Sequence, residues 1–330
     1  MIDTIYIEEE IKEHARTQEI CQRFPKARIV FCERYGEVFN RKVQNFRLQK
    51  QKPALILAKK FQHFVLEAPE GYGIGAKKNF YFSHMMNCIY DCRYCFLQGM
   101  YRSAHYLLFI NFEDFAASIE QIRKEHPTQQ VHFFSGYDCD SLALDQVTKF
   151  SEYFVPLFPR SQNAWLELRT KSVNVKPLLA MRDHNCIAAF SFTPQVISEK
   201  IEDKVPSVSA RLSAIEKLQQ CGWNIGLRFD PLIYHREYRE NYQKLFAQIF
   251  AKIDLDCLHS VSLGQFRLPK TMFNNIHKLY PDEKLFAGPL VEKSGMVSYE
   301  GELGEEMFDF CTTELLKYID KNVFFPCVYE

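Results

Sequence analysis

The 330-residue sequence lacks several features that define easily recognised classes of protein. No apolar run approaches the roughly 18 residues needed to cross a bilayer, so we expect no membrane span. The first 20 residues are acidic and lack the apolar core of a secretory signal, so we expect a cytosolic protein. The formal net charge is zero, which gives no support for nucleic-acid binding. Hydrophobic residues make up 47%, enough for a substantial core.

The sequence also lacks a disulfide framework, although it contains eleven cysteines. An odd, scattered set in a long chain without a signal does not form such a framework, so clustered cysteines are more typical of metal or catalytic sites. Three of them lie in CIYDCRYC, residues 88–95, with the spacing C-x3-C-x2-C. We interpret most of the remaining cysteines as small, buried apolar residues.

Short β-like runs alternate with helical patterns through most of the chain. Six runs are rich in β-branched and aromatic residues and mostly apolar, as expected for strands buried on both faces: 79–84, 131–136, 164–170, 187–192, 224–231 and 259–264. Repeated strand–helix–strand order predicts parallel strands, either in an open doubly wound sheet or in a complete or partial barrel of the TIM type. Six units are two short of a closed eightfold barrel, as in a partial (βα)6 barrel. Both architectures place function at the C-terminal ends of the strands, and CIYDCRYC follows the first of them.

The helical patterns and the ends of the chain complete the predicted organisation. Three segments have clear amphipathic patterns. The first begins after Asn111, a candidate N-cap, the second ends at Gly222, and the third covers 238–253. Segments 143–155 and 174–185 are weaker helix predictions, and a last helix is expected near 305–320. We predict an N-terminal α/β extension at 1–76, the barrel at 77–280 and a C-terminal cap at 281–330.

Three neighbouring thiolates suit zinc, copper(I) or an iron–sulfur cluster. Structural zinc requires four ligands, and His84 is the available fourth, but no second cysteine pair follows. In a [4Fe–4S] cluster, three thiolates leave one iron open for a substrate or cofactor. C-x3-C-x2-C with an aromatic residue, here Tyr94, before the last cysteine is similar to the signature of radical S-adenosylmethionine enzymes, which have a partial barrel.

Further motifs resemble the spore photoproduct lyase family: YIEEEI, CRYCFLQG, DSLALD, LRTK, DPLIY, QFR and YIDKNVFFP. This resemblance implies repair of a thymine dimer photoproduct in DNA. It also implies a [4Fe–4S] cluster, S-adenosylmethionine cleaved to a 5′-deoxyadenosyl radical, and an external one-electron donor such as flavodoxin or ferredoxin.

The resemblance assigns roles to individual residues. Cys88, Cys92 and Cys95 would hold the cluster; Lys171 and Ser191 would bind S-adenosylmethionine, and Tyr94 would pack beside it. The ordinary alternatives are a surface lysine, a strand-end serine and a core tyrosine.

Three departures from the family pattern concern the substrate. Alignment on DSLALD places Tyr137 where the family has a hydrogen-donating cysteine, and Cys139 lies two residues away, so both are candidate donors. Phe96 stands where the family has a tyrosine. The stretch that matches a basic hairpin of the family, residues 288–306, contains one Lys and five Glu, which weakens docking to duplex DNA.

Several functional alternatives stay open from the sequence. The segment 41–60 has seven Lys or Arg and no acidic residue, and is either a phosphate-contacting patch or a solvated strip. Arg228, Asp230 and Arg267 are either substrate contacts or members of internal salt bridges. The protein is therefore expected to be a lyase acting on DNA, a radical enzyme with a different substrate, or a non-catalytic zinc-binding protein.

Overall fold

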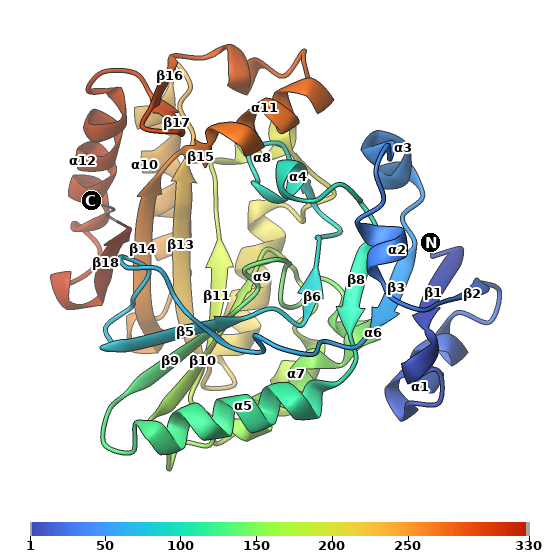
Figure 1. The fold of residues 1–330 in the computed structure, drawn as a ribbon. Helices are drawn as coiled ribbons and strands as arrows, with labels where there is room; N and C mark the ends of the chain where they lie inside the picture. Colours follow the sequence, from blue (N-terminus) through green and yellow to red (C-terminus); the bar gives the residue numbers. More distant parts are fainter. Residues whose placement is uncertain (1, 328–330) are drawn as a thin grey trace.

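The computed structural model describes residues 2–327, and its main feature is a curled sheet of parallel strands. Six neighbouring strands follow one another in chain order: β5 (Lys78–Phe82), β9 (Val131–Ser135), β10 (Ala164–Thr170), β11 (Cys186–Ser191), β13 (Asn224–Leu232) and β14 (Leu258–Gln265). The short β4 (Leu66–Glu67) pairs with one edge and β18 (Phe324–Cys327) with the other, so the barrel is partial (Figure 1). All six predicted strands are confirmed, as is the choice of a partial barrel.

Helices cover the outside of the barrel, and the three clearest helix predictions are confirmed. They are α5 (Phe112–Glu125), α9 (Val208–Gln219), which is followed by Gly222 at φ +75°, and α10 (Tyr238–Phe250). Asn111 precedes α5 but does not cap it through its side chain; that amide instead bonds the backbone N–H and C=O of Lys60 and the carboxylate of Asp114.

The two weaker helix predictions were only partly right. Segment 143–155 divides into α6 (Asp145–Thr148) and α7 (Phe150–Phe154), because Lys149 between them has a left-handed backbone at φ +52°. Segment 174–185 contains only a 3-10 turn, Lys176–Ala180, which begins around Pro177 and ends where Met181 becomes extended. Proline favours such a start but cannot continue an amide ladder.

A second sheet lies beside the barrel, at the right of Figure 1. Its order is β2 (Arg28–Cys32), β1 (Thr4–Glu8), β3 (Leu55–Ala58), β8 (Tyr106–Phe109) and β6 (Met85–Met86). Helices α1 (Ala15–Arg23), α2 (Gly36–Phe39) and α3 (Phe46–Gln51) accompany it. This sheet combines strands from before and after residue 76. The predicted boundary between an N-terminal extension at 1–76 and the barrel at 77–280 stays a prediction.

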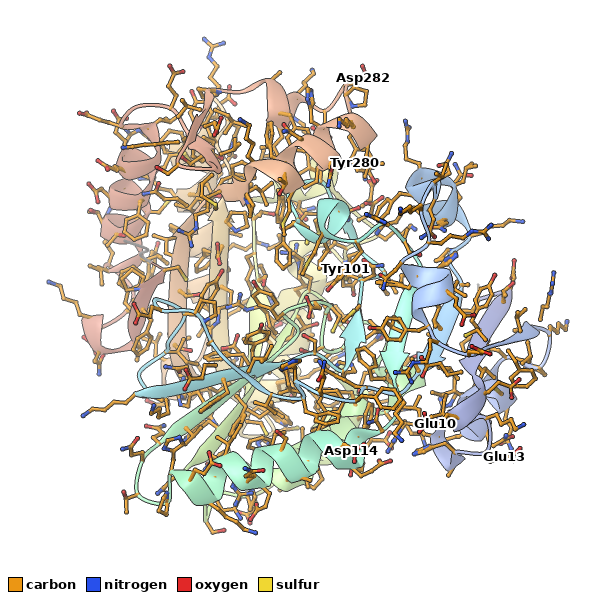
Figure 2. The ribbon with its side chains drawn as sticks, in the orientation of Figure 1. Glu10, Glu13, Tyr101, Asp114, Tyr280 and Asp282 are labelled. Atoms are coloured by element: carbon orange, nitrogen blue, oxygen red, sulfur yellow. The ribbon has the colours of Figure 1, made fainter. Side chains whose placement is uncertain are left out.

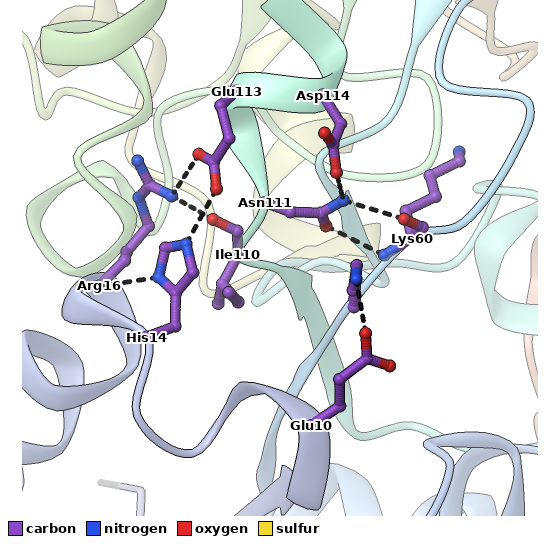
Figure 3. A network of polar contacts seen from close by, with 9 residues as sticks. Glu10, His14, Arg16, Lys60, Ile110, Asn111, Glu113 and Asp114 are labelled. Carbon is purple, nitrogen blue, oxygen red and sulfur yellow. Dashed lines mark hydrogen bonds and ion pairs between the residues drawn. The ribbon is translucent and has the colours of Figure 1, made fainter.

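Polar contacts join this N-terminal region to α5 (Figure 3). His14 Nε2 lies 2.8 Å from a carboxylate oxygen of Glu113, and the Arg16 guanidinium donates to the Ile110 carbonyl and lies 4.1 Å from the centre of the Phe112 ring. These contacts fix the orientation of the N-terminal region, because they tie the start of α1 to the start of α5.

The C-terminal region lies across the C-terminal ends of β13 and β14 (Figure 1). It contains β15 (Arg267–Pro269), α11 (Lys270–Leu279) and a hairpin of β16 (Leu290–Lys293) and β17 (Met296–Tyr299). The following helix, α12 (Leu303–Leu315), lies alongside α10 and β14. Helix α11 packs closely on α4 (Leu97–Met100): a Cβ on Gly99 would lie 2.5 Å from the Met272 carbonyl oxygen. The helix expected near 305–320 is confirmed as α12. Among residues 2–327, no helix has the length and apolar character required to span a membrane.

Candidate active site

A cavity of about 250 Å³ opens at the C-terminal ends of the parallel strands. Its wall includes the ends of β5, β9, β10, β11, β13 and β14 together with the loop that carries the three clustered cysteines. All eight predicted site residues line it: Cys88, Cys92, Tyr94, Cys95, Tyr137, Cys139, Lys171 and Ser191. Residues that are up to 103 positions apart in the sequence therefore meet at one place.

The cysteine loop is held in place by backbone pairing. Cys92 lies in β7 (Asp91–Cys92), which pairs in antiparallel fashion with β12 (Glu202–Asp203), and the Cys95 N–H donates to the Cys92 carbonyl at 3.0 Å. The Tyr90 N–H lies 3.4 Å from Cys88 Sγ, so a backbone donor faces the sulfur. Burial, with the nearby Asp140 charge, raises the pKa of the Cys88 thiol to about 12, and burial also raises the pKa of Cys92 and Cys95.

This donor set fits an iron–sulfur cluster. Three soft sulfur ligands from one short loop line one cavity, which is the donor set that iron–sulfur clusters use. Cys88, Cys92 and Cys95 are therefore the residues that would hold the cluster.

His84 does not fit the role of a fourth ligand. It is buried, its ring stacks on that of Phe150 with centroids 3.9 Å apart, and it is not part of the cavity wall. Burial lowers the pKa of His84 to about 3. Within the described residues, no group of three or more His, Cys, Asp and Glu side chains is arranged to hold a single metal ion. The Cys3His zinc alternative is therefore not favoured.

Glu202 connects two of the predicted cofactor-binding residues and was missed from the sequence. Its carboxylate accepts the Tyr94 hydroxyl and lies 3.2 Å from Lys171 Nζ. Ser198 Oγ, at 2.6 Å, and Arg211 Nη2, at 3.3 Å, complete its contacts. Burial opposes its ionisation, but Lys171 and Arg211 outweigh this effect and lower the pKa of Glu202 to about 2. Glu202 thus stays charged and holds Lys171 beside Tyr94.

Asp140, the first residue of DSLALD, positions the same lysine from the other side. Its carboxylate accepts from the Thr170 hydroxyl and the Lys171 N–H, both at 2.6 Å, and from the N–H groups of Leu142 and Ala143 at 3.0 and 2.9 Å. This motif therefore links the loop after β9 to the end of β10. An Asp that bonds amides two and three residues ahead is a local signal that sequence reasoning could have used.

Tyr137 and Cys139, the two candidate hydrogen donors, share the tight loop after β9. Gly136 has φ +85°, and a Cβ there would lie 2.6 Å from Ser141 Oγ, so the turn requires glycine. The Tyr137 ring lies between Tyr81 and Phe96, with centroids 4.8 and 5.5 Å away. Burial and the nearby Cys88 raise the pKa of the Cys139 thiol well above its usual value, so it keeps its S–H bond.

The three candidate substrate contacts separate into two kinds. Arg228 is fully buried, pairs with Glu167 at 2.6 Å and donates to the Ser260 hydroxyl at 2.9 Å, so it belongs to an internal salt bridge. Asp230 and Arg267 do line the cavity. Arg169, which sequence reasoning missed, also lines it and lies 3.2 Å from Glu167.

The basic segment 41–60 does not form a single surface. Arg41, Lys42, Arg47 and Lys52 are exposed, whereas Lys50 is buried against the cavity. The five glutamates of 288–306 are also dispersed: Glu292 pairs with Lys270 at 2.6 Å, and Glu305 and Glu306 lie in the first turn of α12. Acidic residues in a first helical turn are stabilising in themselves. Most of the acidic excess therefore lies outside the hairpin strands.

Two tyrosines flank α4 in the view of Figure 2 and bond acidic residues near the cavity. Tyr280 Oη lies 3.2 Å from Asp91 Oδ1, and Tyr101 Oη lies 2.8 Å from Asp138 Oδ1. The first contact joins the cysteine loop to the end of α11, and the second joins the end of α4 to the loop after β9.

A partial barrel with a three-cysteine loop after its first strand defines a protein of the radical S-adenosylmethionine type. Within this class the chain belongs to the spore photoproduct lyase family, whose model, "Spore photoproduct lyase", matches residues 1–293.

Curated relatives agree with this assignment. The chain is 26% identical over 203 residues to spore photoproduct lyase of Bacillus subtilis (strain 168), and 26% identical over 204 residues to that of Geobacillus sp. (strain Y412MC61). Each alignment covers 60% of this chain and 59% of the relative.

Solved structures support the fold. One is a variant of spore photoproduct lyase with bound AdoMet and dinucleoside spore photoproduct, with a TM-score of 0.85, 18% identity and coverage of 100% of this chain and 99% of the other. Another, spore photoproduct lyase complexed with dinucleoside spore photoproduct, has a TM-score of 0.82 at 18% identity and the same coverage.

Proposed function

We propose that this protein is a radical S-adenosylmethionine enzyme that repairs a thymine dimer photoproduct in DNA. The observation that carries the proposal is that the eight predicted site residues line a single cavity at the C-terminal ends of the barrel strands. The spore photoproduct lyase structures that resemble this chain, one of them with bound AdoMet and both with a dinucleoside photoproduct, support the same reading. A cytosolic location and an external donor such as flavodoxin or ferredoxin are part of the proposal.

When bound, a [4Fe–4S] cluster and S-adenosylmethionine supply an electron and a 5′-deoxyadenosyl radical that abstracts a hydrogen atom from the substrate. Cys88, Cys92 and Cys95 would hold the cluster. Lys171 and Ser191 would bind S-adenosylmethionine, with Lys171 held in place by Glu202 and Asp140. The cavity at the strand ends places these groups together, and a bound substrate that fills it would keep water from a reactive radical.

Cys139 is the first candidate for returning a hydrogen atom to the product. Its S–H bond would break as a C–H bond forms on the substrate radical, which leaves a sulfur-centred radical on Sγ. Cys139 shares the cavity with the cluster cysteines and is 5% exposed. Tyr137, whose hydroxyl lies in the same wall, is the second candidate.

A radical enzyme of the same type with a non-DNA substrate is the second candidate function. Phe96, which has no hydroxyl, lies in the cavity wall where the family pattern has a tyrosine. The C-terminal hairpin also lacks a basic excess, since β16 and β17 carry one Glu and one Lys.

An anaerobic assay distinguishes these functions. Reconstituted, reduced protein is incubated with S-adenosylmethionine and DNA that contains the photoproduct, with undamaged DNA of the same sequence as the control. We expect release of 5′-deoxyadenosine and conversion of the photoproduct to two thymines. Cofactor cleavage without this conversion would remove the lyase function and keep the radical one. Zinc without acid-labile sulfide would contradict both.

Replacing Cys139 with alanine tests the donor. We expect cofactor cleavage to continue while correct repair falls by at least about tenfold, equivalent to about 1.4 kcal/mol in the barrier, with side products in its place. Product analysis by chromatography and mass spectrometry measures both quantities. Tyr137→Phe is the matched variant: the same loss there, with unchanged products for Cys139→Ala, would assign the donor role to Tyr137.

A further inference from the structure

Lys50 is the residue of the basic 41–60 segment that is withdrawn from solvent. It lies near the end of α3, in the N-terminal region, and is 8% exposed. Its side chain lines the cavity together with the three cluster cysteines. Arg47 and Lys52, on and next to the same helix, are exposed. Among the basic residues on and next to α3, Lys50 is therefore the one that is buried.

The charge of Lys50 is only weakly compensated by its ion pair. Lys50 Nζ lies 3.9 Å from Asp91 Oδ1, which is beyond hydrogen-bond distance. Asp91 is held more closely by Arg93, at 2.8 Å, and it also accepts from Tyr280 Oη at 3.2 Å. Burying an ammonium group is costly unless negative charge lies nearby. Lys50 lines the cavity, so an anion bound there would compensate its charge further than Asp91 does.

Building on the proposed function, we propose that Lys50 is a positioning residue for the [4Fe–4S] cluster, whose negative charge it stabilises and whose reduction potential it raises. Reduction adds a negative charge, and a nearby cation favours the more negative state. The N-terminal region would then contribute directly to the electronic properties of the barrel's cofactor.

A redox titration of the reconstituted protein, followed by electron paramagnetic resonance, tests this inference. Lys50→Met removes the charge and keeps most of the apolar stem. At the midpoint potential of the wild type, we expect the ratio of reduced to oxidised cluster in Lys50→Met to be about tenfold lower than in the wild type. This corresponds to a midpoint potential lower by about 59 mV for a one-electron couple. Lys50→Arg should behave as the wild type. Lys52→Met, an exposed neighbour, should leave the potential unchanged.

Each result supports or overturns the inference. An unchanged potential in Lys50→Met overturns it, even if binding of a DNA substrate is weakened. Failure of Lys50→Met to assemble a cluster supports it if Lys50→Arg restores assembly, and overturns it if Lys50→Arg also fails. A wild-type protein that takes up no iron and sulfide overturns the proposed function as well, whereas a wild-type cluster with an unshifted Lys50→Met cluster overturns this inference alone.

Discussion

Replacing Cys88 with alanine is expected to abolish cluster assembly and cofactor cleavage. The three sulfur atoms come from one short loop and line one cavity, so each is one of the three protein ligands that the cluster would have. Removing one sulfur ligand leaves two, which are too few to hold the cluster. We expect acid-labile sulfide near background and 5′-deoxyadenosine release lower by at least about 1,000-fold, equivalent to about 4 kcal/mol in the barrier. Iron and sulfide analysis with a single-turnover assay measures the effect.

The fold should survive this change, which makes the result specific. Cys88 is partly exposed and its loop is held mainly by backbone pairing and by the Asn87 side chain, which donates to the Ser103 and His105 carbonyls at 2.7 Å. The melting temperature of the cluster-free protein should therefore change by only a few degrees. Cys257→Ala, at a 3-10 turn away from the cavity, is the control and should keep full sulfide. Full sulfide and activity in Cys88→Ala would refute the cluster assignment.

The barrel could be predicted from the sequence because its strands are buried on both faces. β11, CIAAFS, is buried at all six positions, which is why the sequence shows a short apolar run there. The Cys-rich loop could be placed too, because in such folds the loops after the strands gather at one end. The N-terminal sheet was harder to predict, since β6 and β8 join β1–β3 across a long separation in sequence.

Most of the site's supporting residues could not be predicted, because their signals are not local. Glu202 lies in the segment IEDK and resembles a solvated helix end, yet long-range pairing of β12 with β7 buries it against Tyr94. Lys50 likewise resembles its exposed neighbours in a basic segment. Only the position of α3 beside the cysteine loop shows that its side chain reaches the cavity. Sequence motifs thus predict candidate reacting groups, and the tertiary structure shows which other residues contact them.

The second large effect is expected from substitution of Arg228, and it concerns the stability of the fold rather than catalysis. Arg228→Met is expected to lower the free energy of unfolding by about 3 kcal/mol or more, because it leaves the buried Glu167 carboxylate without its closest cation. Arg169, at 3.2 Å from Glu167 but partly exposed, compensates only in part. Chemical denaturation of the cluster-free protein measures the change. Arg239→Met is the matched control: its ion pair with Glu306 is exposed and spans 3.6 Å, so we expect less than about 1 kcal/mol.

The dependence of the unfolding free energy on acidic pH tests the Arg228–Glu167 pair independently. Burial opposes ionisation of Glu167, but Arg228 and Arg169 outweigh it and lower the pKa from 4.5 to about 2. The unfolded chain therefore binds this proton at a higher pH than the native protein does. The stabilisation by Glu167 is complete above pH 4.5 and is lost as pH falls through about 2.

Glu202 has a similarly lowered pKa of about 2, so the wild type alone cannot separate the two carboxylates. The difference between wild type and Arg228→Met removes the contribution of Glu202, which both proteins share. It reports on Glu167, together with His132, His259 and Asp230, whose pKa values the Arg228 charge also lowers. We expect the gap in unfolding free energy between the two proteins to shrink as pH falls from 4.5 towards 2. The double variant Glu167→Gln/Arg228→Met should be more stable than Arg228→Met, since it no longer buries an unpaired charge. A gap that is constant with pH, or a double variant less stable than the single one, would show that Arg228 stabilises the barrel by packing rather than by charge.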